Sequence, residues 1–168
     1  MDDFIHAQGP AFLAHLLRRI ADDLVQGAAD WYPKAGVGAP PRTASTLLAL
    51  DANGPLGVTT IAAVLRQSHP LVITWIRQLE ALACVETRAD PHDRRRSVIA
   101  LTRKGRAEVK RLRAALGPME QASRELLDAA GPDMFDALWR MEQAGRERPF
   151  AQRLEACSRN ARRPRKVP

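Results

Sequence analysis

The sequence predicts a mainly α-helical protein with one small β-hairpin wing: a winged helix-turn-helix flanked by N- and C-terminal dimerisation helices. Three observations carry this prediction. Two short helical segments are separated by a single turn. Two five-residue segments of strand character follow them, joined by a turn and a run of three arginines. Long stretches on both sides of this unit repeat apolar residues every three or four positions.

The first element is an amphipathic helix expected from Pro10 to Trp31. Proline suits a first helical turn, where its missing N–H leaves no hydrogen bond unmade. The Pro- and Gly-rich stretch 33–41 predicts a linker after the helix. The apolar stripe, which recurs at helical spacing, consists of Phe12, Leu16, Leu17, Ile20, Leu24, Ala28 and Trp31.

Three short helices are expected next, at 41–52, 59–67 and 68–83. Ser68 is a favoured residue for the N-cap of the third, and Pro70 fits its first turn. The second and third helices, joined by one turn, predict a helix-turn-helix, a motif that places its second helix in the major groove of DNA.

A hairpin with a cationic tip follows the third helix. Its strands are expected at 84–88 and 97–101, and a turn at 90–93 precedes Arg94, Arg95 and Arg96. Such a tip can reach the minor groove beside a helix that lies in the major groove. We therefore expect double-stranded DNA as the partner of this unit.

The C-terminal part predicts two further helices. Thr102 can cap a helix that runs from about residue 104, past a kink at 117–118, to the Gly-Pro pair at 131–132. A last helix is expected over 133–157. Because these apolar stripes are too wide for one short chain to cover, we expect a homodimer.

These elements divide the chain into four segments. Residues 1–40 are the N-terminal dimerisation helix and linker, and 41–103 are the winged helix-turn-helix DNA-binding domain. Residues 104–157 are the C-terminal dimerisation helices. Residues 158–168 hold five basic residues and no acidic one, and are expected to be a disordered basic tail.

Charge and composition support a polyanion partner. The net charge is +7, and the tail carries +5 of it. Residues 66–113 hold twelve basic and five acidic residues, so the other segments are acidic on balance. This uneven distribution of charge predicts one basic face that binds nucleic acid.

Several functional classes are not expected. The sequence has no nucleophile elbow, P-loop or GxGxxG, so we expect no enzyme and no cofactor. Its histidines and its two cysteines lack metal-ligand spacing, so no metal is expected, and a reducing cytoplasm suits the cysteines. We see neither a signal peptide nor an apolar run that would span a membrane.

The chain resembles the MarR family of bacterial winged helix-turn-helix regulators over roughly residues 12–154. The segment GPLGVTTIAAVL followed by SHPLVITWIRQLEALACVETR is similar to the family's helix-turn-helix. The segment DPHDRRRSVIALTRKG is similar to its wing and the start of the next helix. The resemblance implies a nucleoid-associated homodimer that binds a pseudo-palindromic operator, represses transcription, and responds to a small aromatic or phenolic effector.

Three differences from the family pattern matter. Ile73 and Thr74 stand where relatives often have Ser or Thr and then Arg in the recognition helix. Ala83 and Cys84 stand where relatives usually have Gly-Leu. The first helix lacks the cysteine that the family's organic-peroxide sensors use, so that chemistry is not expected.

The wing carries the strongest candidate residues. Asp93 can hold Arg95 extended for the minor groove, while Arg94 and Arg96 meet phosphates. The alternative is a solvated turn. Arg42 and Lys104, near helix starts, are further phosphate contacts or merely exposed charges. On the recognition helix the candidates are Ser68, His69, Leu71, Thr74, Arg77 and Gln78, with capping or solvated surface as the alternative.

A ligand pocket is expected by resemblance, between the first helices and the long helix. Its candidate residues also suit the core and the dimer interface, which is the alternative. They are Phe12, His15, Arg18, Trp31 and Tyr32.

Two other functions stay open. One is a constitutive architectural DNA binder, which the basic tail and the sparse base-reading side chains favour. The other is a protein-interaction module whose winged helix no longer reads DNA, which the absence of arginine at Thr74 leaves open.

Overall fold

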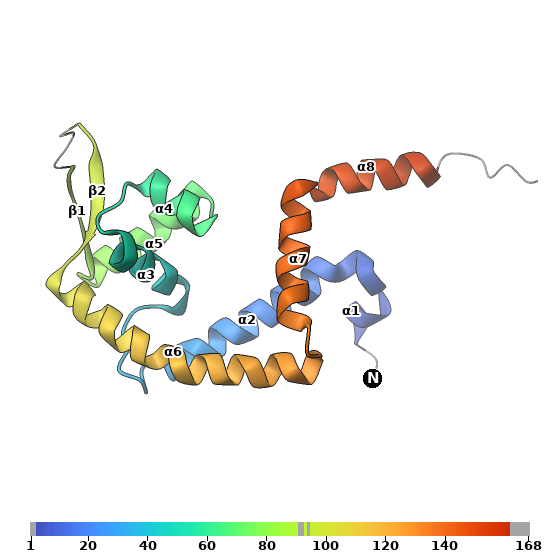
Figure 1. Ribbon diagram of the computed structural model, residues 1–168, viewed down its shortest axis with the longest axis horizontal. Coiled ribbons are helices and arrows are strands. Elements are labelled where there is room, and N and C mark those ends of the chain that lie inside the picture. Colours follow the sequence, from blue (N-terminus) through green and yellow to red (C-terminus); the bar gives the residue numbers. More distant parts are fainter. Residues whose placement is uncertain (1–2, 91–92, 94, 162–168) are drawn as a thin grey trace, which may run out of the picture. The chain divides into compact units, whose positions relative to one another are not determined.

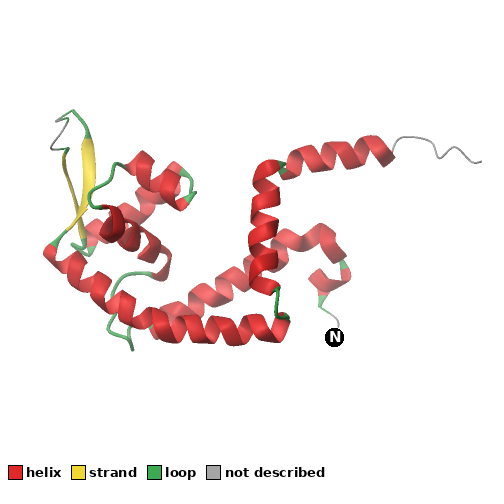
Figure 2. Cartoon of the chain, viewed as in Figure 1, coloured by secondary structure: helices red, strands yellow, loops and turns green. Residues whose placement is uncertain are grey.

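The computed structural model describes residues 3–90, 93 and 95–161 (Figures 1 and 2). The predicted fold class is confirmed, with helices throughout and one two-stranded antiparallel sheet. The chain forms two compact units, residues 1–119 and residues 120–168. Among the described helices, none combines the length and the apolar content needed to cross a bilayer.

The first unit begins with three helical pieces rather than one. These are α1 (Phe4–Ala7), the 3₁₀ helix η1 (Gly9–Phe12) and α2 (Leu13–Trp31). The Asp3 carboxylate closes the start of α1 by accepting from the backbone N–H of Ile5 (2.8 Å) and of His6 (3.1 Å). The expected helix at 10–31 therefore exists as η1 followed by α2.

The next helices form the core of this unit. They are the 3₁₀ helix η2 (Pro41–Thr43), α3 (Ala44–Asn53), α4 (Val58–Leu65) and α5 (His69–Ala81). All agree with the predicted helices to within a few residues. The largest fully buried apolar side chains come from α3, α4, α5 and the following long helix, and are Leu47, Ile61, Leu79, Leu112 and Val72.

The hairpin consists of β1 (Val85–Ala89) and β2 (Ser97–Leu101), paired antiparallel with Val85 opposite Leu101. In Figure 1 it projects away from the helices. Its base is anchored by a further bridge, in which Leu56 and Ile99 exchange two backbone hydrogen bonds of 3.1 and 2.8 Å. The centre of β2 is therefore held on both edges, by β1 and by the loop after α3.

The long helix α6 (Arg103–Ala130) starts where it was expected to. The hydroxyl of Thr102 accepts from the N–H of Gly105 (3.0 Å), which confirms Thr102 as its cap. The helix continues through Pro118 and ends at Gly131, whose φ of 135° only glycine adopts readily. Its last part belongs to the second unit.

The second unit holds the end of α6, α7 (Met134–Glu147) and α8 (Phe150–Ala161). The expected single helix over 133–157 is wrong, because Arg148 is extended (φ −137°, ψ 101°) ahead of Pro149, which disfavours the helical conformation in the residue before it. The Arg153 side chain closes α7 by donating to the carbonyls of Arg148 (3.0 Å) and Ala144 (2.6 Å). Helix α8 extends into the expected tail, and residues 162–168 lie outside the described residues.

Candidate nucleic-acid interface

The rotation of α5 about its axis determines which residues can face DNA. Val72, Trp75, Ile76 and Leu79 are buried in the core, and Ile73 is half-buried. The opposite face is therefore exposed. It presents all six recognition-helix candidates, which are Ser68, His69, Leu71, Thr74, Arg77 and Gln78.

Two of these six have specific local contacts. Ser68 occupies the predicted N-cap position with an extended backbone (φ −66°, ψ 143°), although its side chain makes no capping hydrogen bond. Its carbonyl accepts from the N–H groups of Leu71 and Val72, both at 3.1 Å. The Thr74 hydroxyl donates to the carbonyl of Pro70 (3.1 Å), the usual way in which a threonine inside a helix satisfies its hydroxyl.

The wing tip holds its arginines on one carboxylate. Oδ1 of Asp93 accepts from the backbone N–H of Arg95 (3.1 Å) and from its Nε (3.3 Å), and Oδ2 lies 3.5 Å from Nε of Arg96. The Arg95 side chain is 92% exposed while Asp93 is only one-third exposed. This is the geometry expected of an arginine oriented by the carboxylate two residues earlier. Arg94 lies outside the described residues.

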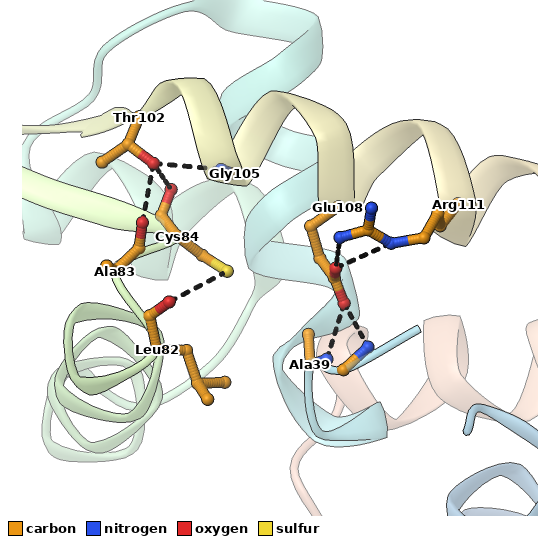
Figure 3. A network of polar contacts seen from close by, with 9 residues as sticks. Ala39, Leu82, Ala83, Cys84, Thr102, Gly105, Glu108 and Arg111 are labelled. Carbon is orange, nitrogen blue, oxygen red and sulfur yellow. Dashed lines mark hydrogen bonds and ion pairs between the residues drawn. The ribbon is translucent and has the colours of Figure 1, made fainter. Parts of the chain in front are cut away.

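The wing and the recognition helix are also bonded to each other. The Thr87 hydroxyl on β1 donates to Oε1 of Glu80 on α5 (2.6 Å). Just before β1, the Thr102 hydroxyl lies within hydrogen-bond distance of the carbonyls of Ala83 (2.7 Å) and Cys84 (3.2 Å) (Figure 3). The Thr102 N–H also donates to the carbonyl of Cys84 (3.0 Å). The two candidate DNA-contacting elements are thus joined directly by the Thr87–Glu80 hydrogen bond, a role of Glu80 that was not predicted from the sequence.

Helix α6 approaches this piece very closely at Gly105. A Cβ at this position would lie 1.9 Å from the carbonyl oxygen of Cys84, so only glycine fits. Ala83, the residue before Cys84, adopts φ +53°, the left-handed conformation that ends α5. The difference from the family's Gly-Leu pattern therefore falls on a position where the backbone favours glycine.

Cys84 lies in the core beneath the same turn. Burial raises the pKa of its thiol, and the negative charge of Glu108 raises it further. The thiol is therefore protonated at neutral pH and a poor nucleophile.

A buried carboxylate, also missed from the sequence, fixes the linker before the helix-turn-helix (Figure 3). Oε1 of Glu108 on α6 accepts from the backbone N–H groups of Gly38 and Ala39 (the latter 2.7 Å), and Oε2 accepts from the guanidinium of Arg111. Burial opposes ionisation of Glu108, but these hydrogen bonds outweigh it and lower its pKa. Its signal in the sequence was an acidic residue on the apolar face of α6, beside Val109 and Leu112.

The two further phosphate candidates differ. Arg42 lies in the three-residue helix η2, and its Nη2 donates to Oδ1 of Asp22 on α2 (2.9 Å). Arg42 thus stands just before α3, as expected, with an exposed ion pair to Asp22, and its contact with a phosphate stays a prediction. Lys104 is exposed in the first turn of α6, as expected.

The five ligand-pocket candidates are not brought together within one protomer. The rings of Phe12 and His15 lie 5.1 Å apart at the start of α2, and Trp31 ends that helix, about 28 Å away at 1.5 Å per residue. Tyr32 is buried in the core, and Arg18 is exposed beside Asp22. A metal site is likewise not formed by the described residues, which contain no suitable group of three His, Cys, Asp or Glu side chains.

Comparisons with known proteins agree with this geometry. The sequence model of the MarR family matches residues 37–96, which include the helix-turn-helix and the wing up to the start of β2. Among curated proteins there is no significant match.

Three solved structures illustrate the similarity. A DNA complex of MepR from S. aureus is 25% identical, covers 78% of this chain and 96% of its own, and has a TM-score of 0.65. The repressor CouR of Rhodococcus jostii, bound to a 23-mer DNA duplex, is 24% identical. The match covers 86% of this chain and 96% of CouR, with a TM-score of 0.64. BpsR of Bordetella bronchiseptica, whose DNA binding is regulated by 6-hydroxynicotinic acid, is 22% identical. The match covers 78% of this chain and 90% of BpsR, with a TM-score of 0.62.

Proposed function

Because the MarR family model matches residues 37–96, we propose that this protein is a DNA-binding transcriptional regulator that represses its target genes. The observation that carries the proposal is the pairing of an exposed polar face on α5 with a wing whose Arg95 is held by Asp93. The MarR family and the matched structures are those of transcriptional regulators and not of enzymes, in agreement with the expectation of a regulator.

In this proposal α5 enters a major groove and the wing enters the adjacent minor groove. Thr74, Arg77 and Gln78 face base edges or phosphates, and Ser68 lies near the phosphate backbone at the start of the helix. Arg95 inserts where a narrow minor groove is most negative, and Arg96 contacts a phosphate. The bonds from Thr87 to Glu80 and from Thr102 to the turn at 83–84 keep the two elements at one spacing.

The regulator acts as a homodimer in this proposal. Support comes from large apolar side chains that remain exposed on α2 in the first unit and on the helices of the second. Two-fold symmetry then calls for a pseudo-palindromic operator whose half-sites are about one helical turn, ~10 bp, apart. The exposed apolar residues of the second unit are Leu126, Phe135, Leu138, Trp139, Met141, Phe150 and Leu154.

We further propose that a small aromatic or phenolic acid controls DNA binding, as 6-hydroxynicotinic acid does for BpsR. The five expected pocket residues do not converge within one protomer, so an effector that uses them requires residues from two copies. Such a ligand would act by favouring one spacing of the two recognition helices over another.

The proposal is tested by selecting bound sequences from a random DNA library and measuring their affinity by fluorescence anisotropy at several salt concentrations. We expect a pseudo-palindromic consensus and affinity that falls steeply with salt. Arg95→Ala should weaken binding about 5- to 100-fold, the effect of losing one good groove contact. Arg140→Ala on α7 removes the same charge outside the proposed interface and should change little. Binding without sequence preference would refute a specific operator.

A second candidate is an architectural protein with little sequence preference. It is favoured by Thr74, whose hydroxyl already bonds to Pro70, and by the apolar Leu71 on the exposed face. The two functions differ in the ratio of specific to non-specific affinity, which is about 10³ or more for a regulator and small for an architectural protein.

A further inference from the structure

The exposed face of α5 carries an apolar side chain in its first turn. Within residues 33–90, 93 and 95–119, two large apolar side chains are exposed, Val64 on α4 and Leu71 on α5. Leu71 is 38% exposed, whereas the next residue, Val72, is fully buried. It is the third residue of α5, and the N-terminal residues of a recognition helix are those that contact base edges. An apolar group therefore lies where contacts to bases are made.

Thr74 adds a second apolar group beside Leu71. Its hydroxyl donates to the carbonyl of Pro70 (3.1 Å), so its one hydrogen is already used and is not free for an acceptor atom on a base. The γ-methyl group is the other group that this side chain offers. Residues three apart on a helix are surface neighbours, with Cβ atoms about 5–6 Å apart. Leu71 and Thr74 thus form a small apolar patch on the exposed face of α5, the Leu71–Thr74 patch.

The surroundings of the Leu71–Thr74 patch suit a polyanion. Glu80 is the only acidic residue of α5, and its carboxylate accepts the hydrogen bond of Thr87 on the wing. Arg77 is exposed one turn after Thr74, and Arg95 is exposed at the wing tip. An apolar patch with basic side chains around it fits a groove of duplex DNA better than it fits the apolar surface of another protein.

We propose that Leu71 and Thr74 recognise the C5-methyl groups of two neighbouring thymines in each half-site of the operator. This inference rests on the proposed function and names two residues that determine its specificity. The thymine methyl is the apolar group among the hydrogen-bonding groups that base pairs present in the major groove. Side chains whose Cβ atoms are about 5–6 Å apart can reach two successive bases, which are stacked about 3.4 Å apart. The half-site should therefore contain T·A pairs where α5 enters the groove.

Replacing thymine by deoxyuridine isolates the methyl group, because every hydrogen-bonding group of the base stays in place. The free energy of burying one methyl-sized apolar group corresponds to about a 4-fold change in affinity. We therefore expect about 4-fold weaker binding for each recognised thymine that is replaced. Thymines outside the contact with α5 should tolerate the replacement.

The experiment uses the full-length chain and the operator selected from the random library. Each thymine of one half-site is replaced in turn by deoxyuridine, and affinity is measured by fluorescence anisotropy. Leu71→Ala should bind the thymine and deoxyuridine forms equally at one position, while Leu71→Met, which keeps an apolar side chain, should still prefer thymine. The matched control is Val64→Ala, which shortens the exposed apolar side chain on α4 and should leave every preference for thymine unchanged.

Two variants of Thr74 separate its methyl group from its hydroxyl. Thr74→Val keeps a methyl group and removes the hydroxyl, so it should still prefer thymine at the second position. Thr74→Ser keeps the hydroxyl and removes the methyl, so it should bind the thymine and deoxyuridine forms equally there. The reverse result would overturn the role of the methyl group.

The outcomes distinguish this inference from the proposed function. Equal affinity for all deoxyuridine operators, or a consensus without T·A pairs in the half-site, overturns the recognition of methyl groups and leaves a sequence-specific regulator. A preference for thymine that survives both Leu71→Ala and Thr74→Ser overturns the assignment to these residues. Failure to select any preferred sequence overturns the proposed function and this inference with it.

Discussion

Replacing Glu108 is the sharpest test of how the helix-turn-helix is held on α6. Its side chain is 3% exposed, and one carboxylate serves the backbone N–H groups of Gly38 and Ala39 as well as the Arg111 guanidinium. Glu108→Ala removes all of these acceptors at once. Glu108→Gln keeps one oxygen for the two N–H groups and removes the charge.

The size of each effect follows from which groups lose their acceptors. Glu108→Ala leaves the buried N–H of Ala39 without an acceptor, which lowers the free energy of unfolding by about 1–3 kcal/mol. The partly buried N–H of Gly38 adds a smaller cost because water can reach it. The Arg111 side chain is 44% exposed, so loss of its ion pair adds little. We expect the free energy of unfolding to fall by roughly 3 kcal/mol in Glu108→Ala and by about 1–2 kcal/mol in Glu108→Gln.

The assay is urea unfolding followed by circular dichroism at one fixed protein concentration, because a dimer's stability depends on concentration. The matched control is Glu120→Gln on the same helix, whose ion pair with Arg124 is exposed and should be worth less than about 0.5 kcal/mol.

Stability should also depend on pH through Glu108. Because its folded pKa lies below the ordinary value of 4.5, its contribution is complete above that value and is lost as the pH falls through the folded pKa. Glu108→Gln should flatten the stability curve in this acid range. The reasoning fails if Glu108→Ala costs no more than Glu120→Gln, or if the glutamine variant keeps the wild-type acid dependence.

Three further predictions concern the turn beneath the wing. Gly105→Ala should lower the free energy of unfolding by about 2 kcal/mol or more, because its Cβ would overlap the Cys84 carbonyl; an unchanged thermal midpoint would contradict that close approach. Ala83→Gly should raise stability by roughly 0.5 kcal/mol, since glycine relieves the φ of +53° while adding freedom to the unfolded chain, and chemical denaturation would measure this. Cys84 should react with a disulfide reagent far more slowly than Cys157 under native conditions, because burial raises the pKa of its thiol and shields it; equal rates in single-cysteine variants would refute this.

Much of the fold could be predicted because its signals are local. Thr102 before α6 and Gly131 after it mark the ends of that helix by capping and by backbone freedom, which depend on few neighbours. The break at Arg148 was missed although Pro149 signals it, because apolar spacing continues on both sides. The roles of Glu108 and Gly105 depend on residues more than twenty positions away, which periodicity does not reveal.

In the candidate site, too, features with a local sequence signal were predictable and features that depend on distant residues were not. The carboxylate–arginine pairing of Asp93 and Arg95 was predictable because the two are neighbours in one turn. The rotation of α5 was not, because it depends on where Trp75 and Ile76 find their core. The ion pair of Arg42 was not predictable either, because its partner, Asp22, lies on a different helix twenty residues away.

The bridge between Leu56 and Ile99 has a consequence for how the wing moves. It ties only the middle of β2 to the body of the protein, while Asp93, Arg95 and Arg96 bond chiefly to one another and to Asp90 at the far end. A second tie, from Thr87 to Glu80, holds the middle of β1 to α5. The buried side chain of Ile99 and these two ties fix the root of the wing independently of the bonds made around Asp93. Loss of the Asp93 carboxylate should therefore change how the arginines are held without moving the root of the wing away from α5.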